Sequence, residues 1–254
     1  MQQSPAAVGE PPLLEMRGIG KAFPGVRALD NVDLTLYHGE VLVLLGEHGA
    51  GKSTLIKMLG GAHAPDSGSI SIEGRPILLS SPAAANAAGI GVIFQEFNLI
   101  PGLTAWENIF LGREGRLGFA RKSNERRRAR ELFEQIGVDI PVDAPCSALS
   151  VAQQQIVEIA KALSQEVRRI VMDEPSAALT PNEVDRLFNI IRDLKTKGIG
   201  VIYISHRLDE VFQIGDRVTV LRDGKRVGDL NVGEITRQRM IEMMVGREIE
   251  DEFP

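Results

Sequence analysis

The stretch Gly46-Glu47-His48-Gly49-Ala50-Gly51-Lys52-Ser53 stands between the apolar run Val41-Leu42-Val43-Leu44-Leu45 and a segment with helical periodicity at residues 54–59. The apolar run is typical of a parallel strand that is buried on both faces. The glycines let the backbone wrap closely around an anion, and the helix that follows presents unpaired N–H groups and its positive end. This stretch therefore predicts a phosphate-binding loop between a buried strand and a helix.

The loop has the spacing GxxxxGKS of a P-loop. In such a loop Lys52 contacts the β- and γ-phosphates of a nucleotide, and the hydroxyl of Ser53 binds Mg²⁺. The alternative is an ordinary glycine-rich turn between a strand and a helix, which the motifs further along the chain disfavour. The expected nucleotide-binding residues of this segment are Gly46, Glu47, His48, Gly49, Ala50, Gly51, Lys52, Ser53 and Thr54.

A second strand-like run, Arg169 followed by the apolar residues Ile170, Val171 and Met172, ends in the two carboxylates of Asp173 and Glu174. Two acids that close a buried strand are costly unless a cation lies beside them. We expect Asp173 to bind Mg²⁺ and Glu174 to polarise the water that attacks the γ-phosphate. The alternative is a strand end whose carboxylates are simply solvated.

Two more apolar runs, at residues 89–94 and 201–204, predict buried strands that end at Gln95 and at Ser205-His206. Ligands of open α/β sheets bind at the carboxyl ends of the strands. A histidine at that edge can donate to the γ-phosphate, although a lone histidine more often has a structural role. We therefore expect Gln95 and His206 near the nucleotide.

The composition excludes several classes of protein. The chain has 254 residues and a formal net charge of -5, which gives no electrostatic reason to expect a nucleic-acid partner. Its apolar runs are shorter than the roughly eighteen residues of a membrane helix, and the N-terminus lacks the pattern of a secretory signal. The single cysteine, Cys146, suits a reducing compartment. We expect a cytoplasmic protein.

Short β-like runs precede the phosphate-binding loop, at residues 13–17, 20–23 and 32–37. Together with residues 69–73 they indicate an antiparallel sheet beside the main core. Phe23 lies at the end of one of these runs. Its ring either stacks on a nucleotide base or packs within the sheet.

Capping patterns predict where several helices begin. Thr104 and Ser150 are followed three residues later by Glu107 and Gln153, the form of a capping box, and Thr180 has the same pattern. Ser123 is expected to cap another helix. The capped N-terminus at Ser150 also supplies a site for an anion. Near the end of the chain, Asp223-Gly224 predicts a hairpin, followed by a last helix over residues 234–245.

Taken together, these elements resemble the ATP-binding cassette of ABC transporters over residues 13–245, nearly the whole chain. Several motifs match in the right order. They are the A-loop at Phe23, the Walker A motif at residues 46–53, the Q-loop at Gln95, the signature at residues 149–153, the Walker B motif at residues 170–174, the D-loop at residues 176–180 and the switch histidine at His206.

The resemblance implies an α/β fold: a P-loop NTPase core with a mainly parallel sheet, an antiparallel β subdomain and an inserted α-helical subdomain. It implies one ATPase domain at residues 13–246, with the helical subdomain at about residues 96–165. Residues 1–12 are expected to be a loose tail. Residues 247–254 form a charged end that leads to a second cassette if the chain is half of a tandem protein.

Residues 107–114, 149–155 and 205–208 are most similar to the ribose, galactose and xylose type of importer. The resemblance thus implies an ATPase that powers monosaccharide import, with ATP and Mg²⁺ as cofactors. ATP would lie between the Walker A motif of one cassette and the signature of another, with Ser150, Ala152 and Gln153 on the second face. Gln95 and His206 would complete the shell of the γ-phosphate, and Gln95 would also reach Mg²⁺.

The implied partners are a second cassette, fused or as a homodimer, and a transmembrane permease on the inner face of the membrane. A periplasmic or extracellular sugar-binding protein would act indirectly. Ala152 replaces the second signature glycine, so a regulatory cassette with weak hydrolysis is one alternative, and a non-transport ATPase is another. If the backbone at Ala152 is helical, alanine costs little.

Overall fold

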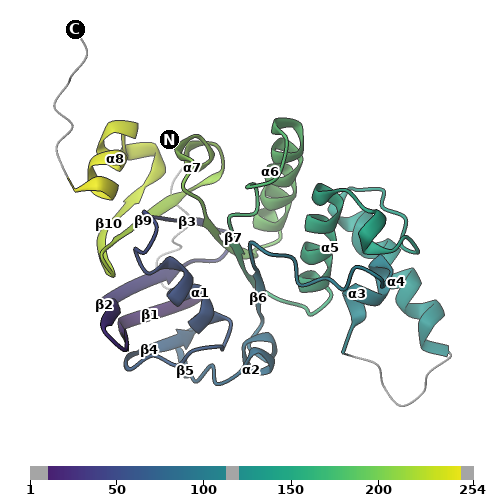
Figure 1. The fold of residues 1–254 in the computed structure, drawn as a ribbon, viewed down its shortest axis with the longest axis horizontal. Coiled ribbons are helices and arrows are strands. Elements are labelled where there is room, and N and C mark those ends of the chain that lie inside the picture. Colours follow the sequence, from purple (N-terminus) through teal and green to yellow (C-terminus); the bar gives the residue numbers. More distant parts are fainter. Residues whose placement is uncertain (1–10, 113–119, 247–254) are drawn as a thin grey trace, which may run out of the picture.

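Two β-sheets of different kinds organise the chain, and the helices lie around and beside them (Figure 1). The computed structural model describes residues 11–112 and 120–246. The expected N-terminal tail, apart from Pro11 and Pro12, and the expected charged end at residues 247–254 lie outside these ranges.

The larger sheet has the strand order β10-β9-β3-β8-β7-β6. All neighbouring strands in it are parallel except β10, which pairs antiparallel with β9 at one edge. Its central strands β3 and β8 are buried along their whole length, as expected for strands covered on both faces. The strands are β3 (Val41–Leu45), β6 (Ile90–Ile93), β7 (Arg169–Asp173), β8 (Gly200–Ile204), β9 (Arg217–Arg222) and β10 (Lys225–Asn231).

The register of the larger sheet brings the ends of β3, β8 and β7 to one level. Leu44 of β3 lies beside Ile204 of β8, and Ile204 lies beside Asp173 of β7. On the other side of β3, Leu45 lies beside Val220 of β9. The segments that follow β3, β7 and β8 therefore leave the sheet at the same edge.

The smaller sheet is antiparallel, with the order β2-β1-β4-β5. Its strands are β1 (Leu14–Phe23), β2 (Val26–Leu36), β4 (Ser67–Ile72) and β5 (Arg75–Ile77). We expected two separate runs at residues 13–17 and 20–23, but they form one strand with irregular register between Met16 and Ile19. Gly18 lies there with φ of 61°, and its N–H donates to the Asp33 carboxylate over 2.7 Å. This irregularity interrupts the alternation of apolar residues.

Helices cover the sheets and form a separate group at one end of the molecule (Figure 1). Helices α3, α4 and α5 lie together beyond β6, while α1 lies on the other side of β6 and β7 in this view. The helices are α1 (Lys52–Leu59), α2 (Pro82–Ala87), α3 (Ala105–Phe110), α4 (Ala120–Ile136), α5 (Val151–Leu163), α6 (Pro181–Thr196), α7 (Leu208–Ile214) and α8 (Arg237–Val245), with 3₁₀ turns at Cys146–Ala148 and Val232–Glu234.

The observed architecture confirms the predicted fold class of a mainly parallel sheet, an antiparallel sheet and an inserted helical group. Two helix starts were wrong. Ser123 lies inside α4 rather than at its start, and the last helix begins at Arg237, where Thr236 supplies the cap. In the described ranges, none of the helices has the length and hydropathy needed to cross a membrane.

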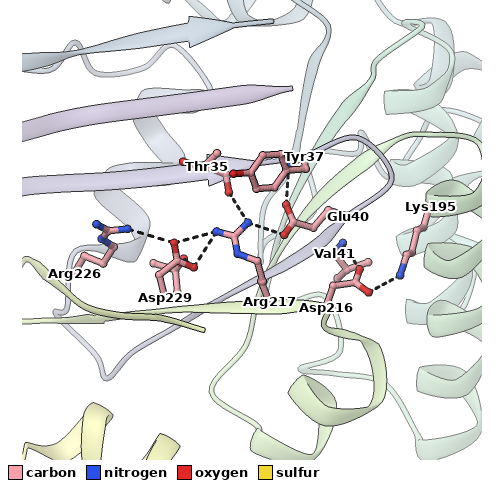
Figure 2. A network of polar contacts seen from close by, with 10 residues as sticks. Thr35, Tyr37, Glu40, Val41, Lys195, Asp216, Arg217, Arg226 and Asp229 are labelled. Carbon is pink, nitrogen blue, oxygen red and sulfur yellow. Dashed lines mark hydrogen bonds and ion pairs between the residues drawn. The ribbon is translucent and has the colours of Figure 1, made fainter. Parts of the chain in front are cut away.

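A partly buried ion-pair network joins the larger sheet to the smaller one (Figure 2). Arg217 at the start of β9 pairs with the buried carboxylate of Glu40 at 2.7 Å and with Asp229 of β10 at 2.9 Å. Its guanidinium also donates to the carbonyl of Thr35 in β2 over 3.4 Å. Burial raises the pKa of Glu40, and the charge of Arg217 opposes that shift. Arg217 is thus the cation that makes burial of the Glu40 carboxylate tolerable.

We expect Arg217→Ala to lower the free energy of unfolding near neutral pH by about 3 kcal/mol, because it leaves a buried carboxylate without its cation. Arg226→Ala is the matched control. Arg226 pairs with Asp229 and Asp33 at a more exposed position, so its loss should cost below about 1 kcal/mol. Urea denaturation of both variants measures the difference.

The deficit of Arg217→Ala should also depend on pH. Because burial raises the folded pKa of Glu40, the cost of its ionised form is largest above that pKa. This cost disappears below the pKa that Glu40 has in the unfolded chain. The stability deficit of Arg217→Ala should therefore shrink as the pH is lowered from neutral. Equal losses for the two arginine variants would contradict the role assigned to Arg217.

Candidate functional site

The phosphate-binding loop at residues 46–51 connects β3 to α1 and leaves little room for a side chain at two of its glycines, Gly46 and Gly51. A Cβ atom on Gly46 would lie 2.4 Å from the carbonyl oxygen of Leu221. Gly51 has φ of 102°, and a Cβ there would lie 2.7 Å from the carbonyl oxygen of Ala28. The loop is thus held between β2 and β9, in a conformation that requires glycine at these two positions.

Lys52, the first residue of α1, lies over this loop. Its Nζ donates to the carbonyl of Gly46 over 2.7 Å and to the carbonyl of Glu47 over 2.9 Å. Desolvation lowers the pKa of Lys52, and the charges of Glu174 and Asp173 act against that shift. The lysine is therefore half-buried close to both carboxylates.

The two carboxylates lie where β7 ends. Burial raises the pKa of Asp173, the charge of Glu174 raises it further, and Lys52 acts to lower it. Glu174 has φ of 46°, a left-handed conformation that is costly for a residue other than glycine. Its backbone N–H donates to the carbonyl of Ile204 over 3.0 Å. The backbone strain at Glu174 thus occurs at a strand end where predicted site residues meet, and strain of this kind tends to cluster at functional sites.

His206 follows β8 and contacts the Glu174 side chain. Its Nδ1 lies 3.1 Å from Oε1 of Glu174, while about half of the histidine side chain is exposed. The ring of His48, in the phosphate-binding loop, lies 6.5 Å from the His206 ring, centroid to centroid. The structure therefore brings together, from three strand ends, the predicted residues Lys52, Asp173, Glu174, His206 and His48.

Three other predicted residues, Ser53, Thr54 and Gln95, lie in the segments that adjoin this group of side chains. The hydroxyl-bearing Ser53 is exposed in the first turn of α1, and Thr54 is half-buried. Gln95 is exposed just after β6, the strand next to β7. Among the described residues, no hydrogen bond or ion pair joins Gln95 to Asp173 or Glu174. Gln95 therefore lies at the same edge of the sheet as Asp173 and Glu174 but does not contact their carboxylates.

Phe23 ends β1 with about a third of its surface exposed. Its ring meets the ring of His63 edge to face, with 5.5 Å between centroids, and the ammonium of Lys21 lies 5.7 Å from its centroid. Phe23 is thus only partly packed within the described residues.

The signature residues lie on a different part of the molecule. Ser150 caps α5: its Oγ accepts from the N–H of Gln153, and its own N–H donates to Oε1 of Gln153 over 2.9 Å. Ala152 is a helical residue of α5 with no positive φ. These residues line a groove of about 300 Å³ between α5 and α6. The structure does not bring them to the phosphate-binding loop (Figure 1).

One buried carboxylate near the site has no predicted role. Glu210 of α7 lies 4% exposed behind the strand ends of β7 and β8. The sequence around Glu210 gives no local signal for such a role, because its partners include Ser176 and Tyr203, which lie outside α7.

Comparisons with known proteins show the family to which this chain is similar. A family model described as "ABC transporter" matches residues 29–177. Among curated proteins, the ribose import ATP-binding protein RbsA of Hahella chejuensis is 52% identical over 244 residues, 95% of this chain. The ribose import ATP-binding protein RbsA 1 of Rubrobacter xylanophilus is 55% identical and covers 96%. The chain spans about half the length of these relatives, 49% of each.

Solved structures show the same architecture. The ADP conformation of MJ1267, an ATP-binding cassette of an ABC transporter, is similar with a TM-score of 0.81 and 28% identity, covering 93% of this chain and 99% of that one. The dimeric structure of MJ0796, a bacterial ABC transporter cassette, has a TM-score of 0.75 and 28% identity, with coverage of 86% and 98%.

The packing around the loop glycines leads to a test of their roles. We expect Gly51→Ala to lower the free energy of unfolding by about 3 kcal/mol, because a positive φ and a clash with the Ala28 carbonyl act together. Gly49 also has a positive φ, of 83°, but a Cβ there meets nothing within 4 Å. Gly49→Ala should therefore cost only about 1 kcal/mol.

Chemical denaturation of the two glycine variants, measured without nucleotide, gives both values. A smaller loss for Gly51→Ala than for Gly49→Ala would show that β2 does not constrain the loop.

Proposed function

This chain belongs to the ABC transporter family, and from that premise we propose that it is the ATP-binding and hydrolysing part of a monosaccharide importer. The observation that carries the proposal is the contact between Glu174 and His206 beside Lys52, at the edge where β3, β7 and β8 end. The sugar-import assignment is supported by the relatives that are named ribose import ATP-binding proteins.

The nucleotide phosphates would bind in the loop at residues 46–51, where Lys52 can exchange its two backbone carbonyl partners for phosphate oxygens. The neighbouring residues from Gly46 to Thr54 would contribute N–H groups and, at Ser53 and Thr54, hydroxyls. Phe23 lies within an exposed part of the smaller sheet and would stack on the base.

The residues at the strand ends fit Mg²⁺, which takes oxygen ligands and uses few from the protein. Ser53 offers an exposed hydroxyl, and Asp173 is a half-buried carboxylate whose pKa is raised by burial, so it benefits from a nearby cation. Gln95 would approach from β6. When bound, Mg²⁺ neutralises phosphate charge during transfer.

Hydrolysis requires a base that orients water. One oxygen of Glu174 contacts His206, and the second oxygen would accept a hydrogen bond from water. His206 holds the carboxylate in place and faces the same edge, where it can donate to the γ-phosphate. The intact pair of Glu174 and His206 favours an ATPase over a regulatory cassette with weak hydrolysis.

A second cassette would complete each nucleotide site. The start of α5, with Ser150, Ala152 and Gln153, lies far from the phosphate-binding loop of the same chain, so these residues would serve a nucleotide held by the other cassette. A head-to-tail pair, fused or as a homodimer, satisfies this arrangement. ATP would then stabilise the closed pair, and hydrolysis would release it.

The remaining assignments follow from this proposal. Residues 13–246 would form one ATPase domain with a helical subdomain at about residues 96–165, which docks on a transmembrane permease at the inner face of the membrane. A sugar-binding protein outside would act through that permease. Gln95 would transmit the nucleotide state, because nearby Asn98 donates its N–H to Glu158 of α5 over 2.8 Å and accepts from Lys161 over 3.1 Å.

Glu174→Gln should keep the affinity for Mg·ATP within a few-fold of wild type and lower kcat by about 10²-fold or more, because the amide cannot accept a proton. Calorimetric titration and a phosphate-release assay measure the two effects. Asp193→Asn, an exposed acid-to-amide change on α6, is the control and should leave both values unchanged. Hydrolysis by Glu174→Gln at the wild-type rate would refute the assignment of the base.

Ala152 has a helical backbone, so we expect the signature to close on ATP as it stands. Light scattering of Glu174→Gln should show a dimer that forms only with Mg·ATP, and adding Ala152→Gly should change its dissociation constant less than about tenfold. A monomer that only the glycine variant converts to a dimer would contradict this expectation and indicate a weakened signature.

A further inference from the structure

The carboxylate of Glu210 is a buried centre of hydrogen bonds directly behind the Glu174 and His206 pair. Its Oε1 accepts from Ser176 Oγ over 2.7 Å and from Arg207 Nη1 over 3.0 Å. Its Oε2 accepts from Ser205 Oγ over 2.7 Å and from Tyr203 OH over 2.9 Å. Ser176, Tyr203 and Ser205 are themselves buried.

These donors come from two separate segments that carry the site. Ser176 lies two residues after Glu174, in the loop between β7 and α6. Tyr203 and Ser205 lie at the end of β8 and precede His206, and Ser205 Oγ also accepts from the N–H of Arg207 over 3.0 Å. One side chain therefore ties together the loop that presents Glu174 and the loop that presents His206.

The arrangement fixes geometry because a buried carboxylate is tolerated only when donors surround it. Each oxygen of Glu210 has two donors, so a movement of either loop would leave a buried polar group unsatisfied. Burial raises the pKa of Tyr203, and the charge of Glu210 raises it further, so the phenol keeps the proton that it donates.

Glu174 needs such support because its own backbone is strained. A non-glycine residue with φ of 46° persists only where the surrounding structure imposes that conformation. The hydrogen bond from the N–H of Glu174 to the carbonyl of Ile204 fixes the backbone at Glu174 itself. The hydrogen bond from Ser176 Oγ to Glu210 fixes the chain two residues later.

We propose that Glu210 is a positioning residue that holds the loops at residues 174–176 and 205–207 in the arrangement in which Glu174 and His206 meet. The inference rests on the proposed function for its effect on turnover. The Glu210 carboxylate is enclosed by its four donors, so it would not contact a bound nucleotide directly. It acts through the two residues that it holds.

The kinetic test compares Glu210→Ala and Glu210→Gln with Asp209→Ala, an exposed neighbour on the same helix. Glu210→Ala should lower kcat by about 10²-fold while KM changes little, because misplacement of about 1 Å is enough for such a loss. Glu210→Gln should recover part of kcat, since its amide oxygen still accepts and the hydroxyls can accept from its NH₂ group. Asp209→Ala should match wild type.

A double-mutant cycle distinguishes positioning from a general loss of stability. If Glu210 acts through His206 and Glu174, then Glu210→Ala should cost much less in a His206→Ala background than in wild type. Ser176→Ala and Ser205→Ala each remove a single hydroxyl and should lower kcat in the same direction. If Glu210→Ala fails to fold, the kcat values of these two serine variants decide whether Glu210 has the positioning role.

A second measurement does not depend on turnover. Hydrogen exchange of peptides that cover residues 174–177 and 205–207 should be faster in Glu210→Ala than in Asp209→Ala, with the rest of the sheet unchanged. If wild type hydrolyses ATP and the Glu210 and serine variants keep its kcat and exchange rates, the positioning role is overturned. If wild type does not hydrolyse ATP, the proposed function fails, and the exchange rates still decide whether Glu210 holds the loops.

Discussion

The carboxyl ends of β3, β8 and β7 meet at one edge of the larger sheet, and the whole site depends on that alignment. Leu42 and Leu44 of β3 face the core that includes α1, whereas Val43 and Leu45 face the core that includes α7 and α8. A slip of one residue would exchange these two faces. Packing of apolar side chains in short strands therefore fixes the positions of charged groups that lie outside the core.

The strand ends were predictable from sequence because parallel strands buried on both faces form continuous apolar runs. Helix starts were predictable where both residues of a capping box are present. Thr104, Ser150 and Thr180 are each followed by Glu or Gln three residues later, and all three cap helices. Ser123 has Arg126 at that position, and it lies inside α4 instead. A serine alone is thus a poor predictor of a helix start.

Other features were not predictable because they depend on distant contacts. The irregular register of β1 obscures its alternation, so one strand looked like two. The left-handed backbone of Glu174 has no local signature, since glycine, not glutamate, is the residue expected there. Glu210 resembles any polar residue of a short helix until Ser176, from a loop that is 34 positions away, is placed against it.

The neighbours of β3 in the sheet affect how the chain can fold during synthesis. Val41–Leu45 pairs with β8 and β9, which begin at Gly200 and Arg217, and with no earlier strand. This wholly apolar strand is therefore made long before either of its partners leaves the ribosome. Until then it is an unpaired, aggregation-prone segment. Folding of the central sheet must therefore wait until β8 and β9 have been made, more than 150 residues after β3.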